Sequence, residues 1–158
     1  MKEKTYSYDE AFEAALQYFK GDELAARVWV NKYSMKDSYG HIYEVSPEDM
    51  HWRIANEIAR IENKYENPLK AEEIFGLLDH FKYIIPAGSP MTGIGNNHQI
   101  ASLSNCFVIG LDGQADSYGG IIRIDEEQVQ LMKRRGGVGH DLSHILSLIH
   151  ISEPTRLQ

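Results

Sequence analysis

The residues best suited to chemistry lie between positions 102 and 145, and the first of them is a cysteine. Cys106 is the only cysteine among 158 residues and begins the apolar run Cys106-Phe107-Val108-Ile109. A lone cysteine in an apolar strand is most often an inert small side chain. Here Ser102, Ser104 and Asn105 precede it, and glycine-rich segments lie on both sides, which suits a polar ligand. The residues therefore leave two interpretations open, a structural cysteine and a functional thiol.

A glycine cluster, Gly136-Gly137-Val138-Gly139, follows Lys133-Arg134-Arg135. Glycines permit concave backbone conformations whose N–H groups bind anions. No Gly-Lys-Ser/Thr follows, so the cluster is not a Walker loop, and it precedes a strand, so it is not a Rossmann fingerprint. The alternative is structural: a helix C-cap that lets the chain approach its neighbour closely.

Histidines near the glycine cluster raise two further kinds of site, a metal site and a nucleophile pair. His140-Asp141-x-x-His144 has ligand-type residues four apart, but on a strand they stand too far apart for easy joint ligation, so we expect no metal. A Cys106–His140 nucleophile pair is geometrically possible across adjacent strands, which would favour a hydrolase.

A strand–helix–strand block must position these residues. The composition of residues 100–111 is typical of a buried strand, and Asp112-Gly113 marks a turn. A helix opens at Asp116-Ser117 and ends at the basic residues 133–135, and residues 138–145 are predicted as the next strand. This order favours a right-handed parallel crossover, and hence an α/β sheet or barrel.

Upstream, residues 1–82 carry four amphipathic patterns and no visible chemistry. Apolar residues recur at helical spacing, which predicts helices over 8–19, 22–33, 46–67 and 71–82. Asp22 and Ser46 are predicted to cap the second and the third. Residues 83–86 are then predicted as a short strand or an entry segment, and residues 87–97 as a turn-rich loop.

Composition limits the class of protein. Hydrophobic content of 42%, charged content of 25% and a net charge of −7 are those of a globular protein without a basic nucleic-acid-binding face. A single cysteine excludes an intrachain disulfide, and no apolar run could span a bilayer. We therefore expect a cytoplasmic, soluble protein that binds neither membrane nor nucleic acid directly.

Four motifs, in order, resemble the start of the catalytic domain of ribonucleotide reductase large subunits: SPMTG, SLSNCFVIG, ADSYGGI and QLMKRRGGVGHDLSHI. The helical segments ARVWVNKYSMKD and SPEDMHWRIANEIARIE are similar to the adenosylcobalamin-dependent, class II branch. The resemblance implies an α/β fold: a helical N-terminal region (1–82), then the first strands (83–145) of a truncated ten-stranded α/β barrel.

The resemblance also implies roles for individual residues. Cys106 corresponds to the redox-active cysteine that is oxidised to a disulfide as the ribose 2′-hydroxyl is reduced, with its partner on a later strand. Ser89, Asn105 and Gly137 match substrate-binding positions. Asp116 and Ser117 match the specificity site, where a deoxynucleoside triphosphate or ATP effector binds.

For the whole parent protein, the resemblance implies adenosylcobalamin, a ribonucleotide substrate (expected to be a diphosphate), thiyl-radical chemistry, a thioredoxin- or glutaredoxin-type reductant and a homodimer. Leu146 stands where the family has arginine, and residues 146–158 have no family counterpart. We interpret this tail as out-of-frame or adapter-derived sequence. The first hypothesis is thus a reductase fragment that is inactive alone, and the alternative is a small nucleotide-binding regulatory domain without redox chemistry.

Overall fold

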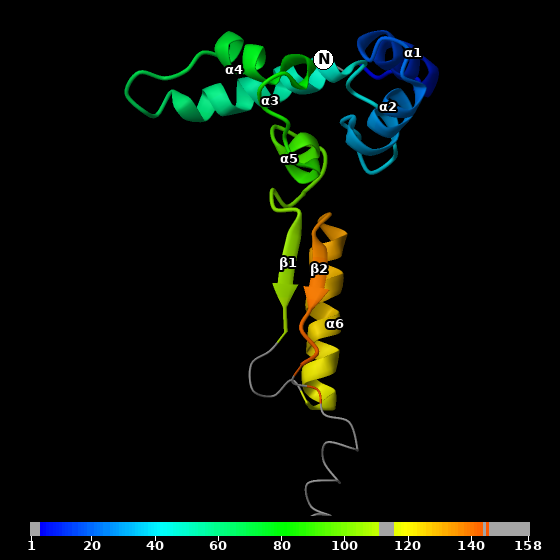
Figure 1. The fold of residues 1–158 in the computed structure, drawn as a ribbon, viewed down its shortest axis with the longest axis vertical. Coiled ribbons are helices and arrows are strands. Elements are labelled where there is room, and N and C mark those ends of the chain that lie inside the picture. The colour runs from blue at the N-terminus through cyan, green and yellow to red at the C-terminus, as the bar shows by residue number, and fades with distance from the viewer. Residues whose placement is uncertain (1–3, 111–115, 144, 146–158) are drawn as a thin grey trace, which may run out of the picture. The chain divides into compact units, whose positions relative to one another are not determined.

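The computed structural model describes residues 4–110, 116–143 and 145. The chain forms two compact units, Met1–Leu103 and Ser104–Gln158, which are described separately (Figure 1). The first unit extends beyond Lys82, where the composition changes. The proposed division of the chain into family domains stays a prediction.

The first unit is helical. Its elements are α1 (Tyr8–Tyr18), α2 (Glu23–Val28), a π-helical turn (Trp29–Tyr33), α3 (Pro47–Glu62), α4 (Ala71–Leu78), a 3₁₀ turn (Asp79–Phe81) and α5 (Gly88–Gly93). Side chains at the helix starts explain several of these boundaries. Ser7 and Glu10 form a capping box on α1, and Asp22 accepts a hydrogen bond from the backbone N–H of Ala25 on α2.

The four predicted helices are confirmed, with changes at their ends. The second finishes as a π-helical turn, the third ends at Glu62, and the fourth ends at Leu78. The core of the unit is built from buried side chains of α1–α4 and the π-helical turn, among them Trp29, Val30, Met50, Ile54 and Leu78.

The following segment differs from the sequence prediction in two places. Residues 83–86 form no strand; instead the N–H groups of Tyr83 and Ile84 both donate to the carbonyl of Leu77. Part of the predicted loop forms helix α5. Sequence patterns missed this short helix because a distant side chain, Arg53, satisfies the carbonyls at its end.

The second unit is a strand–helix–strand block. Strands β1 (Cys106–Ile109) and β2 (Gly137–His140) pair in parallel, with Cys106 opposite Gly137 and Ile109 opposite His140. Helix α6 (Tyr118–Lys133) connects them and packs on both. The parallel pairing and the helix are therefore confirmed. Among the described residues the sheet has two strands, so the ten-stranded barrel stays a proposal.

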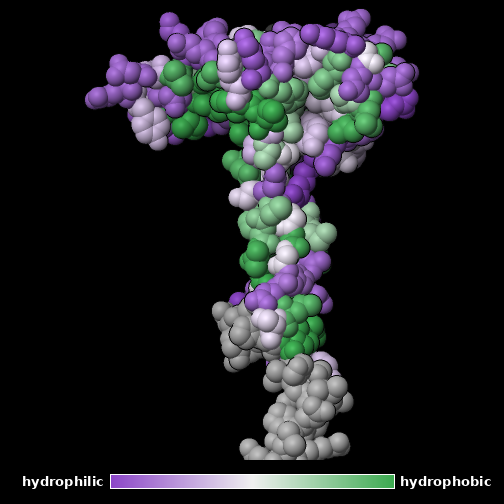
Figure 2. Space-filling view, in the orientation of Figure 1, coloured by the Kyte–Doolittle hydropathy of each residue, from purple (hydrophilic) through white to green (hydrophobic). Residues whose placement is uncertain are grey.

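The strands are shorter and more exposed than predicted. Exposed and half-buried residues alternate along both strands, and Val108 is 82% exposed. The prediction of a buried strand over 100–111 is wrong for this reason: α6 covers only one face of the sheet. Apolar residues reach the surface in both units (Figure 2). In the part of the chain that is described, no helix has the length and apolar character needed to cross a bilayer.

Candidate functional site

The thiol of Cys106 lies beside a glycine on the neighbouring strand. Cys106 is exposed, and a Cβ atom added to Gly137 would stand 3.6 Å from its Sγ and 3.2 Å from the carbonyl oxygen of Asn105. The N–H of Gly137 donates to that same carbonyl at 2.6 Å. Three of the predicted site residues therefore meet at the start of the strand pair. Because Gly137 has no side chain, the thiol is open on the sheet face that α6 does not cover.

The glycine cluster does not form an anion nest at its first two residues. The N–H of Gly136 donates to the carbonyl of Leu131, and the N–H of Gly137 donates to Asn105. Arg135 takes the left-handed conformation with φ 67°. Its backbone N–H donates to the carbonyl of Met132, which completes a Schellman-type end for α6. The structural interpretation, a helix end with close chain approach, is thus the one observed. The prediction that glycines end the helix needs correction, because the left-handed residue is Arg135.

The proposed Cys106–His140 nucleophile pair is wrong. Cys106 is opposite Gly137, whereas His140 is opposite Ile109, three positions farther along the strands. Residues an odd number of positions apart point to opposite faces, and three positions span about 10 Å. His140 therefore faces the α6 side, where its Nε2 is buried without a hydrogen-bond partner among the described residues. His144, the second histidine of the His140-Asp141-x-x-His144 motif, lies outside the described residues.

Asp116 and Ser117, the predicted effector residues, stand at the start of α6. Ser117 is the N-cap, and its Oγ accepts a hydrogen bond from the backbone N–H of Gly120 at 3.0 Å. Asp116 is exposed and adjoins a segment, residues 111–115, outside the described part. The structure thus assigns Ser117 a capping role, and effector binding stays a prediction.

Ser89 belongs to the first unit and so is not described together with Cys106. It is 4% exposed within α5, where the hydroxyl of Thr92 donates to the carbonyls of Gly88 and Ser89 at 3.1 and 3.2 Å. A Cβ on Gly88 would stand 3.4 Å from the ring of Tyr33, so this helix start packs on the π-helical turn. The substrate role of Ser89 stays a prediction.

A buried arginine that sequence reasoning missed holds α5 in place. Arg53 donates from Nε to Glu44 Oε1 at 2.6 Å, from Nη2 to the Met91 carbonyl at 2.7 Å and from Nη1 to the Ile94 carbonyl. Burial raises the pKa of Glu44, against the opposing effects of Arg53 and of the Met35 N–H. The sequence offers one signal: Arg53 lies three residues after Met50, at the edge of the apolar stripe of α3.

A partly buried polar cluster joins α1, α3 and the 3₁₀ turn. The Tyr18 hydroxyl donates to Asp79 Oδ1 at 3.1 Å, accepts from the His80 N–H at 2.6 Å and lies 3.3 Å from His51 Nδ1. His51 is fully buried, and its Nε2 has no partner among the described residues. Burial lowers the pKa of His51 to about 4 and raises that of Tyr18.

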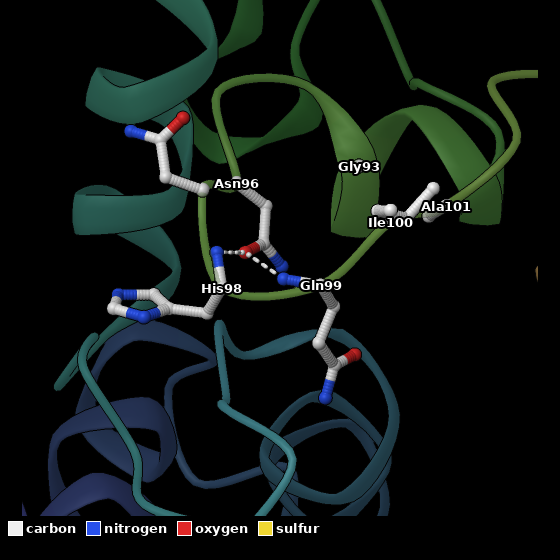
Figure 3. A pocket seen from close by; sticks show the side chains of 7 residues that line it. Gly93, Asn96, His98, Gln99, Ile100 and Ala101 are labelled. Atoms are coloured by element: carbon white, nitrogen blue, oxygen red, sulfur yellow. Dashed lines mark hydrogen bonds between the residues drawn. The ribbon is translucent and has the colours of Figure 1, made fainter.

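The described residues of the first unit line at least two cavities. The more polar one, about 380 Å³, is lined by Gly93, Asn96, Asn97, His98, Gln99, Ile100 and Ala101. Asn96 organises it: its Oδ1 accepts from the backbone N–H groups of His98 and Gln99, as Figure 3 shows, and its Nδ2 donates to the Thr92 carbonyl.

A second cavity, about 430 Å³, is lined mainly by apolar side chains, among them Ile58, Ile61, Ile94 and Leu103. Both cavities are of a size for small-molecule ligands. Within the described ranges, no group of three or more His, Cys, Asp or Glu side chains could hold a metal ion.

Comparison with known protein families gives a match to the helical unit. Residues 19–99, just over half of the chain, match the family model described as "Ribonucleotide reductase, all-alpha domain". No curated protein and no solved structure matches the chain. The matched range covers α2 to α5, and so includes Arg53, Ser89 and the part of the Asn96 cavity up to Gln99.

Proposed function

Because this chain belongs to the ribonucleotide reductase large-subunit family and carries its N-terminal all-α region, we propose that it is part of an enzyme that reduces ribonucleotides, expected to be diphosphates, for DNA synthesis. The single observation that supports a catalytic role for the second unit is the exposed Cys106 thiol beside Gly137. By itself the chain is proposed to be inactive, because it has one cysteine and the reduction needs two.

The proposed reaction uses Cys106 as one of two thiols. Two thiols lose their hydrogens and become a disulfide, and C2′ of the ribose loses its hydroxyl as water and gains a hydrogen. A thioredoxin- or glutaredoxin-type dithiol then reduces the disulfide again. The second thiol would come from outside these 158 residues, at a Cα–Cα distance of about 6 Å from Cys106. Thiyl-radical initiation belongs to the same proposal.

The substrate would lie on the uncovered sheet face. Gly137 supports this, because any larger residue there would stand over the thiol and against Asn105. Asn105 is exposed and adjoins Cys106, so it is proposed as a substrate contact. Ser89 is proposed to contact the phosphate or ribose.

Asp116 and Ser117 are proposed to bind a deoxynucleoside triphosphate or ATP effector. Because the Ser117 hydroxyl already caps α6, a bound effector would influence the start of this helix directly. A homodimer is proposed with it. The exposed apolar residues Tyr118, Ile122, Val129 and Met132 of α6 are consistent with a helix that is covered in a larger assembly.

Adenosylcobalamin as radical source rests only on the sequence resemblance to the class II branch. Its contacts are expected in parts of the parent protein outside these 158 residues. A cytoplasmic location is likewise a proposal. The alternative, a regulatory domain that binds nucleotides at the glycine cluster, is not favoured, because the Gly136 and Gly137 amides already donate within the protein.

The test uses the complete reading frame. The locus is sequenced beyond codon 145, and the encoded protein is assayed for deoxynucleotide formation with a dithiol reductant. We expect further cysteines in the frame, loss of turnover in Cys106→Ser and retained turnover in the matched variant Ser102→Ala. A frame without another cysteine, or full turnover in Cys106→Ser, would overturn the proposal.

A further inference from the structure

Phe107, the residue after Cys106, packs against Gly136, the residue before Gly137. A Cβ atom on Gly136 would stand 2.7 Å from Cε2 and 2.9 Å from Cδ2 of the Phe107 ring. Real Cβ atoms do not approach this closely, so the ring occupies the space that any other residue at position 136 would need. Gly136 is buried, which is consistent with a ring lying over it.

Gly136 is itself held at a defined place. Its N–H donates to the Leu131 carbonyl as the last bond of the α6 helix end, and its Cβ position would be 3.2 Å from that carbonyl oxygen. The contact between Phe107 and Gly136 therefore ties β1 to a point that is fixed by the end of α6 and the start of β2.

A second contact of α6 lies just past the end of β1. Ile124 of α6 packs where a Cβ of Gly110 would be, and that Cβ position is 2.8 Å from the Cδ1 of Ile124. The contact of Phe107 with Gly136 differs from it, because it reaches from β1 to the residue before β2 and so bears directly on the alignment of the two strands.

Alignment decides which way the thiol points. Neighbouring residues of a strand face opposite sides, so Phe107 on the α6 side directs Cys106 to the uncovered side. A shift of one residue would reverse this and turn the thiol toward α6.

We propose that Phe107 is a positioning residue for the redox thiol: its ring, seated over Gly136, sets the strand register that places Cys106 beside Gly137 on the open face of the sheet. The proposal rests on the proposed function for its biological meaning, since it concerns the thiol assigned to ribonucleotide reduction. The geometry that it asserts can be measured without nucleotide or turnover, so the two can fail independently.

The first experiment measures the register by disulfide formation in the 158-residue chain. Cys106 is the only native cysteine, so a second one gives an unambiguous product. Neighbouring strands lie about 4.8 Å apart, within the range for a disulfide. In Gly137→Cys, oxidised glutathione accepts the two electrons and two protons as two thiols become a disulfide. Gly139→Cys, on the same face but two positions away, is the matched control.

We expect Gly137→Cys to form the disulfide at least fivefold faster than Gly139→Cys, as measured by intact mass and peptide mapping. Equal rates, or no disulfide at position 137, would overturn the register.

The second experiment tests Phe107 in these backgrounds, with Val138→Cys added to detect a one-residue shift. We expect Phe107→Ala to slow the 106–137 disulfide at least fivefold while the 106–138 disulfide increases, and we expect Phe107→Leu to restore the original preference. An unchanged 106–137 rate in Phe107→Ala would overturn the proposal. Equal rates at positions 137, 138 and 139, as in guanidinium, would also overturn it, because they would show that Phe107 only stabilises the unit.

Discussion

Arg53 and Glu44 form an ion pair inside the helical unit, with Nε and Oε1 2.6 Å apart and side chains 9% and 3% exposed. The same guanidinium binds the Met91 and Ile94 carbonyls, so one buried charge joins α3, the segment before it and the end of α5. The pair thereby holds the helix that carries Ser89.

Removing one partner of this pair should strongly destabilise the unit. Arg53→Met leaves the Glu44 carboxylate buried without its countercharge, at a cost of about 3–5 kcal/mol in the free energy of unfolding. The measurement is urea unfolding followed by far-UV circular dichroism. The matched control is Arg60→Met, which breaks the exposed Arg60–Glu57 pair and should cost about 0–1 kcal/mol. Equal losses in the two variants would contradict the prediction.

Stability should fall with acidification between pH 6.5 and about 4 because of His51. Its pKa is 6.5 when unfolded and about 4 when folded, so below pH 6.5 the unfolded chain takes up a proton that the folded chain does not. The loss reaches about 1.4 kcal/mol per pH unit, and about 3 kcal/mol in total. Urea unfolding at a series of pH values measures it, and His51→Gln should show a flatter profile over this window.

Two other groups with shifted pKa values, Glu44 and Asp37, also change the free energy of unfolding with pH. The raised pKa of Glu44 favours proton uptake by the folded state above pH 4.5, which opposes the His51 effect. Hydrogen bonds from His41, Tyr39 and Tyr43 lower the pKa of Asp37 against the effect of its burial, so its contribution is lost only below pH 3.8. Both are present in wild type and variant, so the difference isolates His51. Parallel profiles would show that His51 is not the responsible group.

Arg135→Gly should stabilise the second unit. Arg135 has φ 67°, a left-handed conformation that costs a non-glycine residue about 1–2 kcal/mol. Glycine at this position should raise the free energy of unfolding of the unit by about 1 kcal/mol. The gain should be seen as slower hydrogen exchange of the α6 and β2 amides. Arg135→Ala removes the same side chain without relieving the backbone and should give no gain. A gain of similar size in Arg135→Ala would place the effect in the side chain.

Ser117→Ala should destabilise the start of α6 by about 1 kcal/mol, because it removes the oxygen that accepts from the Gly120 N–H. Hydrogen exchange of Gly120 and Ile121 reports the change. Ser117→Asp keeps a capping oxygen and should retain protection. If Ser117→Asp loses as much protection as Ser117→Ala, the cap is not what orders this end.

Local patterns explain what could be predicted. Helices α1 to α4 follow from apolar spacing and from capping residues such as Asp22 and Ser46. Helix α6 follows from its opening at Asp116-Ser117 and from its basic end. These signals act within a few positions of themselves. The candidate site could be predicted only as a set of residues. Cys106, Asn105 and Gly137 do meet. Cys106 and His140 do not, because His140 lies three positions farther along its strand than Gly137, the residue paired with Cys106.

The sequence by itself thus determined the helical N-terminal region, the strand–helix–strand order and the presence of one thiol near a glycine cluster. These features depend on residues that are neighbours along the chain. Only the tertiary structure decided that α5 is a helix, that Arg53 is buried and that the thiol faces away from α6. Each of these depends on a contact between distant residues: Arg53 with Met91, and Phe107 with Gly136. Such contacts leave no periodic pattern in the sequence, because their energy comes from packing and hydrogen bonding across the fold.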